Sequence, residues 1–231
     1  MNQPNTAKLI LIRHGQSTWN AANRFSGWVD IPLNSQGRCE AIKAAKKIAE
    51  YDIDICFTSL LMRAKETTAI CLTECGDKCL EKSPVFKHDS KDSNWHGWDK
   101  YEEIPIYTSP DLDERYYGDL QGYNKGEMAK RVGEEIVHQW RRSFRTRPPG
   151  GESLADTAAR TIPYFQKQIL PHLKEGNNVL VSAHGNSLRS IIMHLDNLEE
   201  SKVPNLELAT GIPIVYTVNE SGKIIDKNIL N

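Results

Sequence analysis

Residues 9–17 read LILIRHGQS and place a short apolar run directly before a group of polar side chains. The run Leu9–Ile12 is too short to cross a membrane and is typical of a strand buried on both faces of a parallel sheet. Arg13 and His14 follow it, and we expect Gly15 to let the backbone turn sharply. Because ligands bind at the carboxyl ends of strands in open α/β sheets, this stretch predicts a site. Local capping of the strand is the alternative, since this triplet alone is a weak signal.

The same design returns late in the chain. Residues 178–188 read NVLVSAHGNSL, again an apolar run, a His-Gly pair and a turn into a helix. If the two strands are neighbours in one parallel sheet, His14 and His184 lie at the same edge and at the same height. Nearby arginines would keep either histidine neutral, as a nucleophile must be, but the residues alone do not decide which one attacks.

Hydrophobic patterns alternate between strands and helices along the rest of the chain. Besides the two strands above, we expect helices over 34–51, from 59, from 124, over 134–144 and over 153–173, a strand over 53–58, and a hairpin over 214–225. Pro163 should interrupt the helix that contains it. The pattern predicts an α/β fold with a mainly parallel central sheet, helices on both faces and an edge hairpin.

Residues 76–111 break this pattern with charges, aromatic residues and prolines. We expect an elaborated surface loop there, because long irregular segments in compact domains are typically lids, interface elements or disordered tips. His88 and His96 within it lack a third metal ligand at a suitable spacing, so we interpret them as surface histidines. No repeat or linker splits the chain, and we expect residues 1–231 to form a single domain.

Composition excludes some classes of protein. The 29 basic and 30 acidic residues among 231 nearly cancel, which argues against a general nucleic-acid or anionic-membrane binder. The N-terminus lacks a secretory signal, so we expect a cytoplasmic protein with reduced thiols. Cys71, Cys75 and Cys79 recur at helical spacing, which allows a metal site, but packing as small apolar side chains is the favoured interpretation.

Further candidate residues are cations and one acid. Arg63 falls in the first turns of a helix, where it either joins an anion pocket or is solvated. Glu114 stands among hydrogen-bond donors, as a general acid and base or as a structural ion-pair partner. Arg141 and Arg142 end a helix, where they either favour its dipole or extend an anion site. Together these residues favour a phosphorylated ligand, and arginine side chains can neutralise a transferring phosphoryl group without a metal.

Six motifs carry a more specific signal. They are LILIRHGQSTWN (9–20), RFSGW (24–28), TSLLMRA (58–64), DERYYGDLQGYNK (113–125), WRRSF (140–144) and AHGNSLR (183–189). In this order and over most of the chain, the sequence resembles the cofactor-dependent phosphoglycerate mutases of the histidine phosphatase superfamily. The triplet Arg-His-Gly identifies only the superfamily, whereas the ERYYG and WRR blocks are much more specific.

The resemblance implies roles for individual residues. His14 would be phosphorylated, His184, Arg13 and Arg63 would surround the phosphoryl group, and Glu114 would be the general acid and base. Residues implied to hold the substrate's phosphate and carboxylate are Ser17, Asn20, Ser26, Gly27, Tyr117, Lys125, Arg141, Arg142 and Asn186. The implied reaction interconverts 3-phosphoglycerate and 2-phosphoglycerate in glycolysis and gluconeogenesis, with 2,3-bisphosphoglycerate as primer and intermediate, in a homodimer or homotetramer.

Three stretches depart from the resemblance. The 76–111 segment is longer than expected, the path over 144–152 is short, and the chain stops at Asn231 soon after the last hairpin. Reduced cover over the pocket would admit water and raise phosphatase activity. A phosphomonoester phosphatase on the same scaffold is therefore the alternative function, and a noncatalytic phosphometabolite-binding protein is a more remote one.

Overall fold

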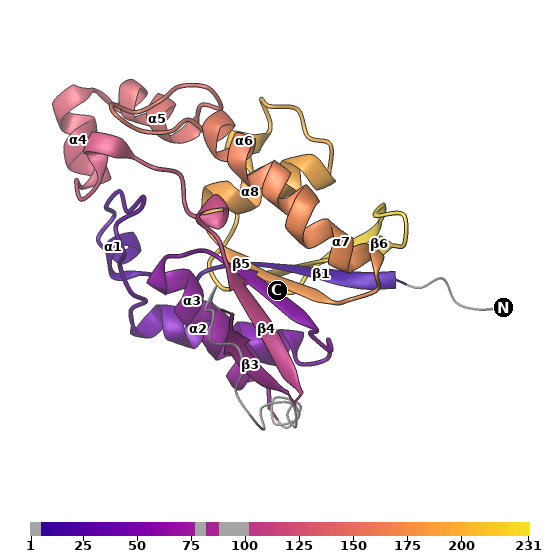
Figure 1. The fold of residues 1–231 in the computed structure, drawn as a ribbon. Helices are drawn as coiled ribbons and strands as arrows, with labels where there is room; N and C mark the ends of the chain where they lie inside the picture. The colour runs from indigo at the N-terminus through magenta and orange to yellow at the C-terminus, as the bar shows by residue number, and fades with distance from the viewer. Residues whose placement is uncertain (1–5, 77–81, 88–101) are drawn as a thin grey trace.

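The computed structural model describes residues 6–76, 82–87 and 102–231. In this part of the chain, seven strands form one sheet in the order β3-β4-β2-β5-β1-β6-β7 (Figure 1). The strands are β1 (Thr6–Arg13), β2 (Ile55–Thr58), β3 (Ser83–Phe86), β4 (Glu103–Thr108), β5 (Val179–Ala183), β6 (Pro213–Asn219) and β7 (Ile224–Ile229). Neighbouring strands from β3 to β1 pair in parallel, and β6 and β7 pair antiparallel. The predicted mainly parallel sheet with an edge hairpin is confirmed.

Helices cover both faces of this sheet (Figure 1). One face carries α2 (Ser35–Ile48) and α3 (Met62–Thr73), and the other carries α6 (Leu154–Tyr164), α7 (Leu170–Lys174) and α8 (Gly185–Leu195). The remaining helices are α1 (Thr18–Ala21), α4 (Lys125–Val132) and α5 (Glu134–Arg142), which gather at the left of the view in Figure 1. Of these, α4 and α5 pack on a small apolar cluster of their own, which includes Phe25, Leu120, Met128 and Val137.

The alternation of side chains along β1 explains its continuous apolar run. Leu9 and Leu11 pack in the core under α6 to α8, whereas Ile10 and Ile12 pack in the core under α2 and α3. All four side chains are at most 1% exposed. A strand with both faces covered needs an apolar residue at every position, and this is what the run Leu9–Ile12 supplies.

The turn after β1 lies against the first turn of α2. A Cβ atom on Gly15 would lie 2.2 Å from the carbonyl oxygen of Gly37, and a Cβ on Gly37 would lie 2.1 Å from that of Gln16. Gly15 does not have a positive φ angle. The glycine is therefore needed for close contact between two backbones rather than for the sharp turn that the sequence suggested.

The expectation of a loop over 76–111 is wrong for two stretches. Residues 83–86 and 103–108 form β3 and β4, which extend the parallel sheet beyond β2. Pro84 and Pro105 lie inside these strands, and proline normally argues against a strand because it cannot donate to the ladder. His88 and His96 lie outside the described residues.

Local signals elsewhere are mostly confirmed. Asn34 and Asn124 cap α2 and α4, and the break after Pro163 is a π-helical turn over Phe165–Ile169.

Cys71 is buried and its thiol donates to a backbone carbonyl, which agrees with the packing interpretation. Cys75 is disulfide-bonded, so the expectation of reduced thiols is wrong at that position. No helix among the described residues is long and apolar enough to cross a bilayer.

The Gly15–Gly37 contact generates a stability prediction. We expect Gly37→Ala to lower the free energy of unfolding by about 1–3 kcal/mol, because the new methyl group meets rigid backbone atoms. Gly126→Ala is the control, since a Cβ there meets only a side-chain oxygen of Asn124 at 3.3 Å. Urea denaturation of both variants measures the difference. Equal midpoints for Gly37→Ala and the unchanged protein would contradict the contact.

Candidate active site

The two histidines meet because β1 and β5 are neighbours. Their parallel register sets Arg13 opposite Ala183, so the residues that follow each strand lie at the same height. The backbone N–H of His14 donates to the Ala183 carbonyl at 3.0 Å. The imidazole rings of His14 and His184 lie 4.9 Å apart between centroids, and both side chains are buried. The juxtaposition predicted from the repeated motif is confirmed.

The backbone fixes the tautomer of His14. Its Nδ1 atom lies 2.7 Å from the carbonyl oxygen of Gly15, which can only accept a hydrogen bond. Nδ1 therefore carries the proton in the neutral ring, and Nε2 keeps its lone pair. Burial lowers the pKa of His14 well below its usual value, and the charges of Arg63 and Arg13 lower it further. The neutral, nucleophilic form is favoured, with burial rather than the arginines as its main cause.

His184 lies deeper than His14 and is fully buried. Its Nε2 atom lies 2.7 Å from the hydroxyl of Ser59, and its backbone N–H donates to the hydroxyl of Ser187 at 3.2 Å. Burial, followed by the charges of Arg63 and other neighbours, lowers its pKa well below the usual value. Unlike His14, it is not among the residues that line the neighbouring pocket.

Arg63 and Arg13 flank the histidines from separate elements. Arg63 is only 1% exposed, so it is not a solvated arginine. It donates to the carbonyls of Val29 at 2.9 Å and Gly27 at 2.8 Å. These bonds fix the loop of residues 26–29 against α3, the helix that carries Arg63. Arg13 donates to the Leu208 carbonyl at 2.7 Å, while its buried Nε atom has no hydrogen-bond partner within the described part of the chain. That N–H is therefore available to a ligand.

Glu114 is held as an ionised carboxylate. Burial alone would raise its pKa, but hydrogen bonds from the Arg115 backbone and Asn186, with the charges of Arg13 and Arg63, lower it overall. All three of its hydrogen bonds go to Oε1, from Arg115 N at 2.7 Å and from Asn186 N and Nδ2 at 3.2 and 2.7 Å. Among the described residues Oε2 accepts none, so this oxygen is free to exchange a proton with a ligand.

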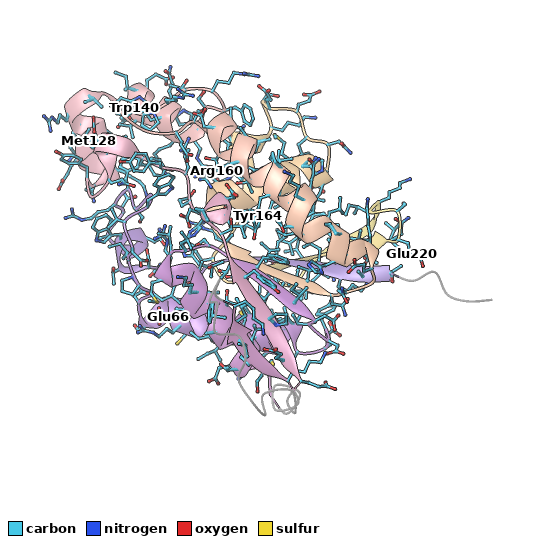
Figure 2. The ribbon with its side chains drawn as sticks, viewed as in Figure 1. Glu66, Met128, Trp140, Arg160, Tyr164 and Glu220 are labelled. Carbon is cyan, nitrogen blue, oxygen red and sulfur yellow. The ribbon has the colours of Figure 1, made fainter. Side chains whose placement is uncertain are left out.

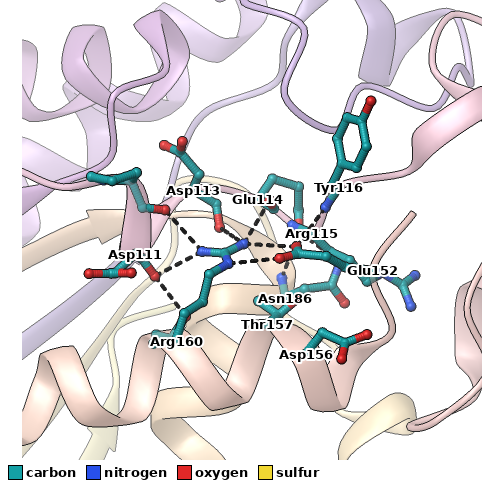
Figure 3. Close-up of polar contacts among 12 residues, drawn as sticks. Asp111, Asp113, Glu114, Arg115, Tyr116, Glu152, Asp156, Thr157, Arg160 and Asn186 are labelled. Carbon is teal, nitrogen blue, oxygen red and sulfur yellow. Dashed lines mark hydrogen bonds and ion pairs between the residues drawn. The ribbon is translucent and has the colours of Figure 1, made fainter. Parts of the chain in front are cut away.

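Arg160 of α6 fixes the segment that carries Glu114 (Figure 3). Its guanidinium donates to four backbone carbonyls at 2.9–3.0 Å, those of Pro110, Asp111, Asp113 and Glu114. It also pairs with both carboxylate oxygens of Glu152, which in turn accepts from the Tyr116 backbone. Trp28 Nε1 also donates to the Glu114 carbonyl, at 2.6 Å. Nothing in the sequence distinguished Arg160 from an ordinary helix-surface arginine.

The pocket in front of His14 is strongly cationic. Its wall is formed by Arg13, His14, Asn20, Arg24, Phe25, Ser26, Gly27, Arg63, Glu114, Tyr117, Lys125, Arg141, Arg142, Gly185, Asn186, Arg189 and Glu207. Seven arginine and lysine side chains thus face two carboxylates. Such an excess of positive charge suits a ligand with several negative charges.

Most predicted binding residues lie in this wall, but Ser17 does not. The Ser17 hydroxyl accepts from the Asn20 backbone, and the Asn20 side chain accepts from the Ser17 backbone, so Ser17 caps α1. Ser17 therefore caps the helix that carries the wall residue Asn20. The sequence reasoning missed Arg24, Arg189 and Glu207. Arg24 and Arg189 lie inside two of the quoted motifs, RFSGW and AHGNSLR, and this position could have identified them as candidate site residues.

Lys125 reaches the pocket from the start of α4. Its ammonium group lies 5.6 Å from the centre of the Phe25 ring. Burial lowers its pKa to about 8, and the charges of Arg141 and Arg13 contribute to the shift. The charge of this side chain therefore changes near neutral pH, within the range in which enzymes are assayed.

Comparison with known proteins places this site in a family. Residues 9–88 and 96–228 match the model of the histidine phosphatase superfamily, branch 1. The chain is 60% identical to a 2,3-bisphosphoglycerate-dependent phosphoglycerate mutase of Gloeothece citriformis, covering 97% of this chain and 100% of that protein. It is 58% identical to 2,3-bisphosphoglycerate-dependent phosphoglycerate mutase 1 of Gloeobacter violaceus, covering 97% and 99% of the two chains.

Solved structures show the same fold at lower identity. Bacillus stearothermophilus YhfR aligns with a TM-score of 0.73 at 23% identity, covering 94% of each chain. A mycobacterial glucosyl-3-phosphoglycerate phosphatase aligns with a TM-score of 0.73 at 21% identity, covering 96% of this chain and 97% of that one. These two likenesses concern the fold alone. From its family match and its close relatives, the chain belongs to the 2,3-bisphosphoglycerate-dependent phosphoglycerate mutases of the histidine phosphatase superfamily.

Proposed function

We propose that this protein interconverts 3-phosphoglycerate and 2-phosphoglycerate, through a phosphohistidine enzyme and a 2,3-bisphosphoglycerate intermediate. The observation that carries the proposal is the buried, neutral His14, whose Nδ1 proton is held by a carbonyl beside a pocket with seven cations. Relatives at 51–60% identity bear the name of this mutase. A nucleophile, a proton carrier and an anion pocket are the parts that phosphoryl transfer requires.

The first half of the reaction loads His14. Its Nε2 lone pair attacks a phosphorus atom of 2,3-bisphosphoglycerate, so that a P–N bond forms while the P–O bond to the glycerate breaks. Glu114 supplies a proton to the departing oxygen, because the charge of the bound phosphates raises its pKa from the low value of the free pocket. Arg13 and Arg63 neutralise the charge on the transferring group, and we assign to the neutral His184 a hydrogen bond to that group.

The second half moves the phosphoryl group between hydroxyls. Glu114, now ionised, takes the proton of the 2-hydroxyl of 3-phosphoglycerate as this oxygen attacks the phosphohistidine. The P–N bond breaks and 2,3-bisphosphoglycerate forms. After the intermediate reorients, His14 takes the 3-phosphoryl group and Glu114 returns the proton to O3, which releases 2-phosphoglycerate. The cations named above supply all the positive charge in this scheme, and we assign no metal to it.

Further binding roles follow from position in the wall. We assign the phosphate and carboxylate of the substrate to the wall residues Asn20, Ser26, Gly27, Tyr117, Lys125, Arg141, Arg142 and Asn186. The buried Ser26 hydroxyl has no hydrogen-bond partner within the described ranges, which suits a contact to the ligand. We keep Ser17 among these binding residues on the family resemblance, and its hydroxyl also caps the helix that carries Asn20.

The same proposal extends to the setting of the enzyme. We propose that residues 1–231 act as a single domain, because strands from both ends of the chain join one sheet. Its substrates are small phosphorylated glycerates rather than nucleic acids or membranes. We place the enzyme in the cytoplasm, where glycolysis and gluconeogenesis proceed, as a homodimer or homotetramer.

The activity itself is tested with purified protein, 3-phosphoglycerate and a trace of 2,3-bisphosphoglycerate. We expect 2-phosphoglycerate to form, with release of inorganic phosphate much slower than isomerisation. Phosphorus NMR of the mixture follows both products at once, because 2-phosphoglycerate and inorganic phosphate each contain phosphorus. Phosphate release from several phosphomonoesters that outpaces isomerisation would instead establish the phosphatase alternative, and no turnover by folded protein would contradict both.

The pKa of Lys125 generates a prediction about pH. Lys125 is charged below about pH 8 and neutral above it. The substrate's phosphate stays doubly charged over pH 7–9, because its second pKa is near 6. We therefore expect KM for 3-phosphoglycerate to rise by about tenfold over this range, as one charged hydrogen-bond donor is lost.

Two variants separate Lys125 from other groups. Lys125→Arg keeps its charge over pH 7–9, so its KM should change much less with pH. Lys130→Arg, at an exposed position of the same helix, should behave like the unchanged protein. An identical rise of KM in all three proteins would show that another group titrates.

A further inference from the structure

Residues 204–208, here called the rim segment, hold three arginines of the pocket. The bonds run from Arg142 to the carbonyl of Pro204 at 2.8 Å, from Arg189 to that of Leu206 at 2.8 Å, and from Arg13 to that of Leu208 at 2.7 Å. Each guanidinium uses only part of its donor capacity in this contact. The rim segment therefore orients these arginines and leaves donors for a ligand.

Glu207 belongs to the same segment and brings a negative charge to this cationic wall. Its side chain lines the pocket, and its Oε1 atom lies 2.8 Å from an amino group of Arg142. The Glu207 side chain is 74% exposed, whereas that of Arg142 is 25% exposed. Glu114 is the other carboxylate of the wall, and the proposed proton transfer accounts for it. No step of the proposed reaction uses Glu207.

We propose that Glu207 is an affinity-determining residue. In the free pocket its carboxylate pairs with Arg142 as an internal counter-anion. When the ligand binds, its phosphate or carboxylate must displace Glu207 from Arg142. An exposed ion pair contributes little to stability, so it breaks at small cost when a stronger anion arrives. The displaced carboxylate then stays near the ligand and repels it. Glu207 thus weakens the binding of anions instead of supporting it. The naming of phosphoglycerates as the ligands rests on the proposed function.

A weakening residue has a use in this pocket. Seven cations would hold a ligand with two phosphates and a carboxylate very tightly. Tight binding of substrate and transition state alike does not raise kcat, and it slows the release of product. A negative charge at the rim offsets part of that attraction without removing any cation that faces the transferring phosphoryl group.

Glu207→Gln tests the inference, because glutamine keeps the shape and removes the charge. The probe is inorganic phosphate, titrated by calorimetry into the free protein at low ionic strength. We expect phosphate to bind about three- to tenfold more tightly than to the unchanged protein, and KM for 3-phosphoglycerate to fall by a similar factor. The difference should shrink at about 0.5 M salt, because screening weakens the repulsion.

Glu200→Gln is the matched control. Glu200 is another exposed glutamate of this region, but it pairs with Arg145 outside the pocket. Its replacement should leave phosphate affinity unchanged. Circular dichroism melts of both variants should match that of the unchanged protein, which shows that any change in affinity is not a folding effect.

The inference is overturned if Glu207→Gln binds phosphate with unchanged or lower affinity, or if Glu200→Gln tightens binding equally. Phosphate binding does not require turnover of any glycerate. A failure of the mutase assay would therefore leave this result standing. Conversely, if the protein is an active mutase but Glu207→Gln leaves its phosphate affinity unchanged, only the inference about Glu207 is contradicted.

Discussion

The parallel pairing of β1 with β5 is the contact on which the rest of the site depends. It sets Arg13 opposite Ala183 and lets the His14 N–H close a last ladder bond to the Ala183 carbonyl. Two imidazoles are thereby buried side by side at the carboxyl edge of the sheet, where burial keeps both neutral. The Gly15 carbonyl then accepts a hydrogen bond from Nδ1–H of His14. A nucleophilic nitrogen therefore results from burial together with one backbone hydrogen bond, without a separate base to deprotonate it.

The proton carrier of the proposed reaction is placed by a different set of contacts. Arg160, which Figure 2 labels on α6, and Trp28 on the 26–29 loop hold the backbone around Glu114. Figure 3 shows the contacts of Arg160. Hydrogen bonds and nearby cations keep the Glu114 carboxylate ionised until a ligand brings negative charge. The protonation of Glu114 is therefore coupled to occupancy of the pocket. Its position depends on a helix that contributes no side chain to the pocket wall.

The sequence predicted those features that local patterns encode. The repeated strand, His-Gly and helix motif gave the position of both histidines, because parallel strands in one sheet share an edge. Prediction from the sequence missed β3 and β4, because their prolines resemble loop signals. It also missed the roles of Arg160 and Glu207, because their contacts arise only when distant segments pack. The Ser17 hydroxyl caps α1, a contact that its place in the motif did not indicate. Residue type and motif therefore locate a site better than they assign each residue's contact.

The central claim is that Nε2 of His14 accepts the phosphoryl group, because Nδ1 is committed to the Gly15 carbonyl. The most direct measurement is phosphorus NMR of the protein loaded with 2,3-bisphosphoglycerate, together with its intact mass. The account predicts one acid-labile phosphoryl group per chain, bonded to Nε2 of a histidine and absent from His14→Gln. A phosphoryl group on Nδ1, or equal labelling of His14→Gln, would contradict it.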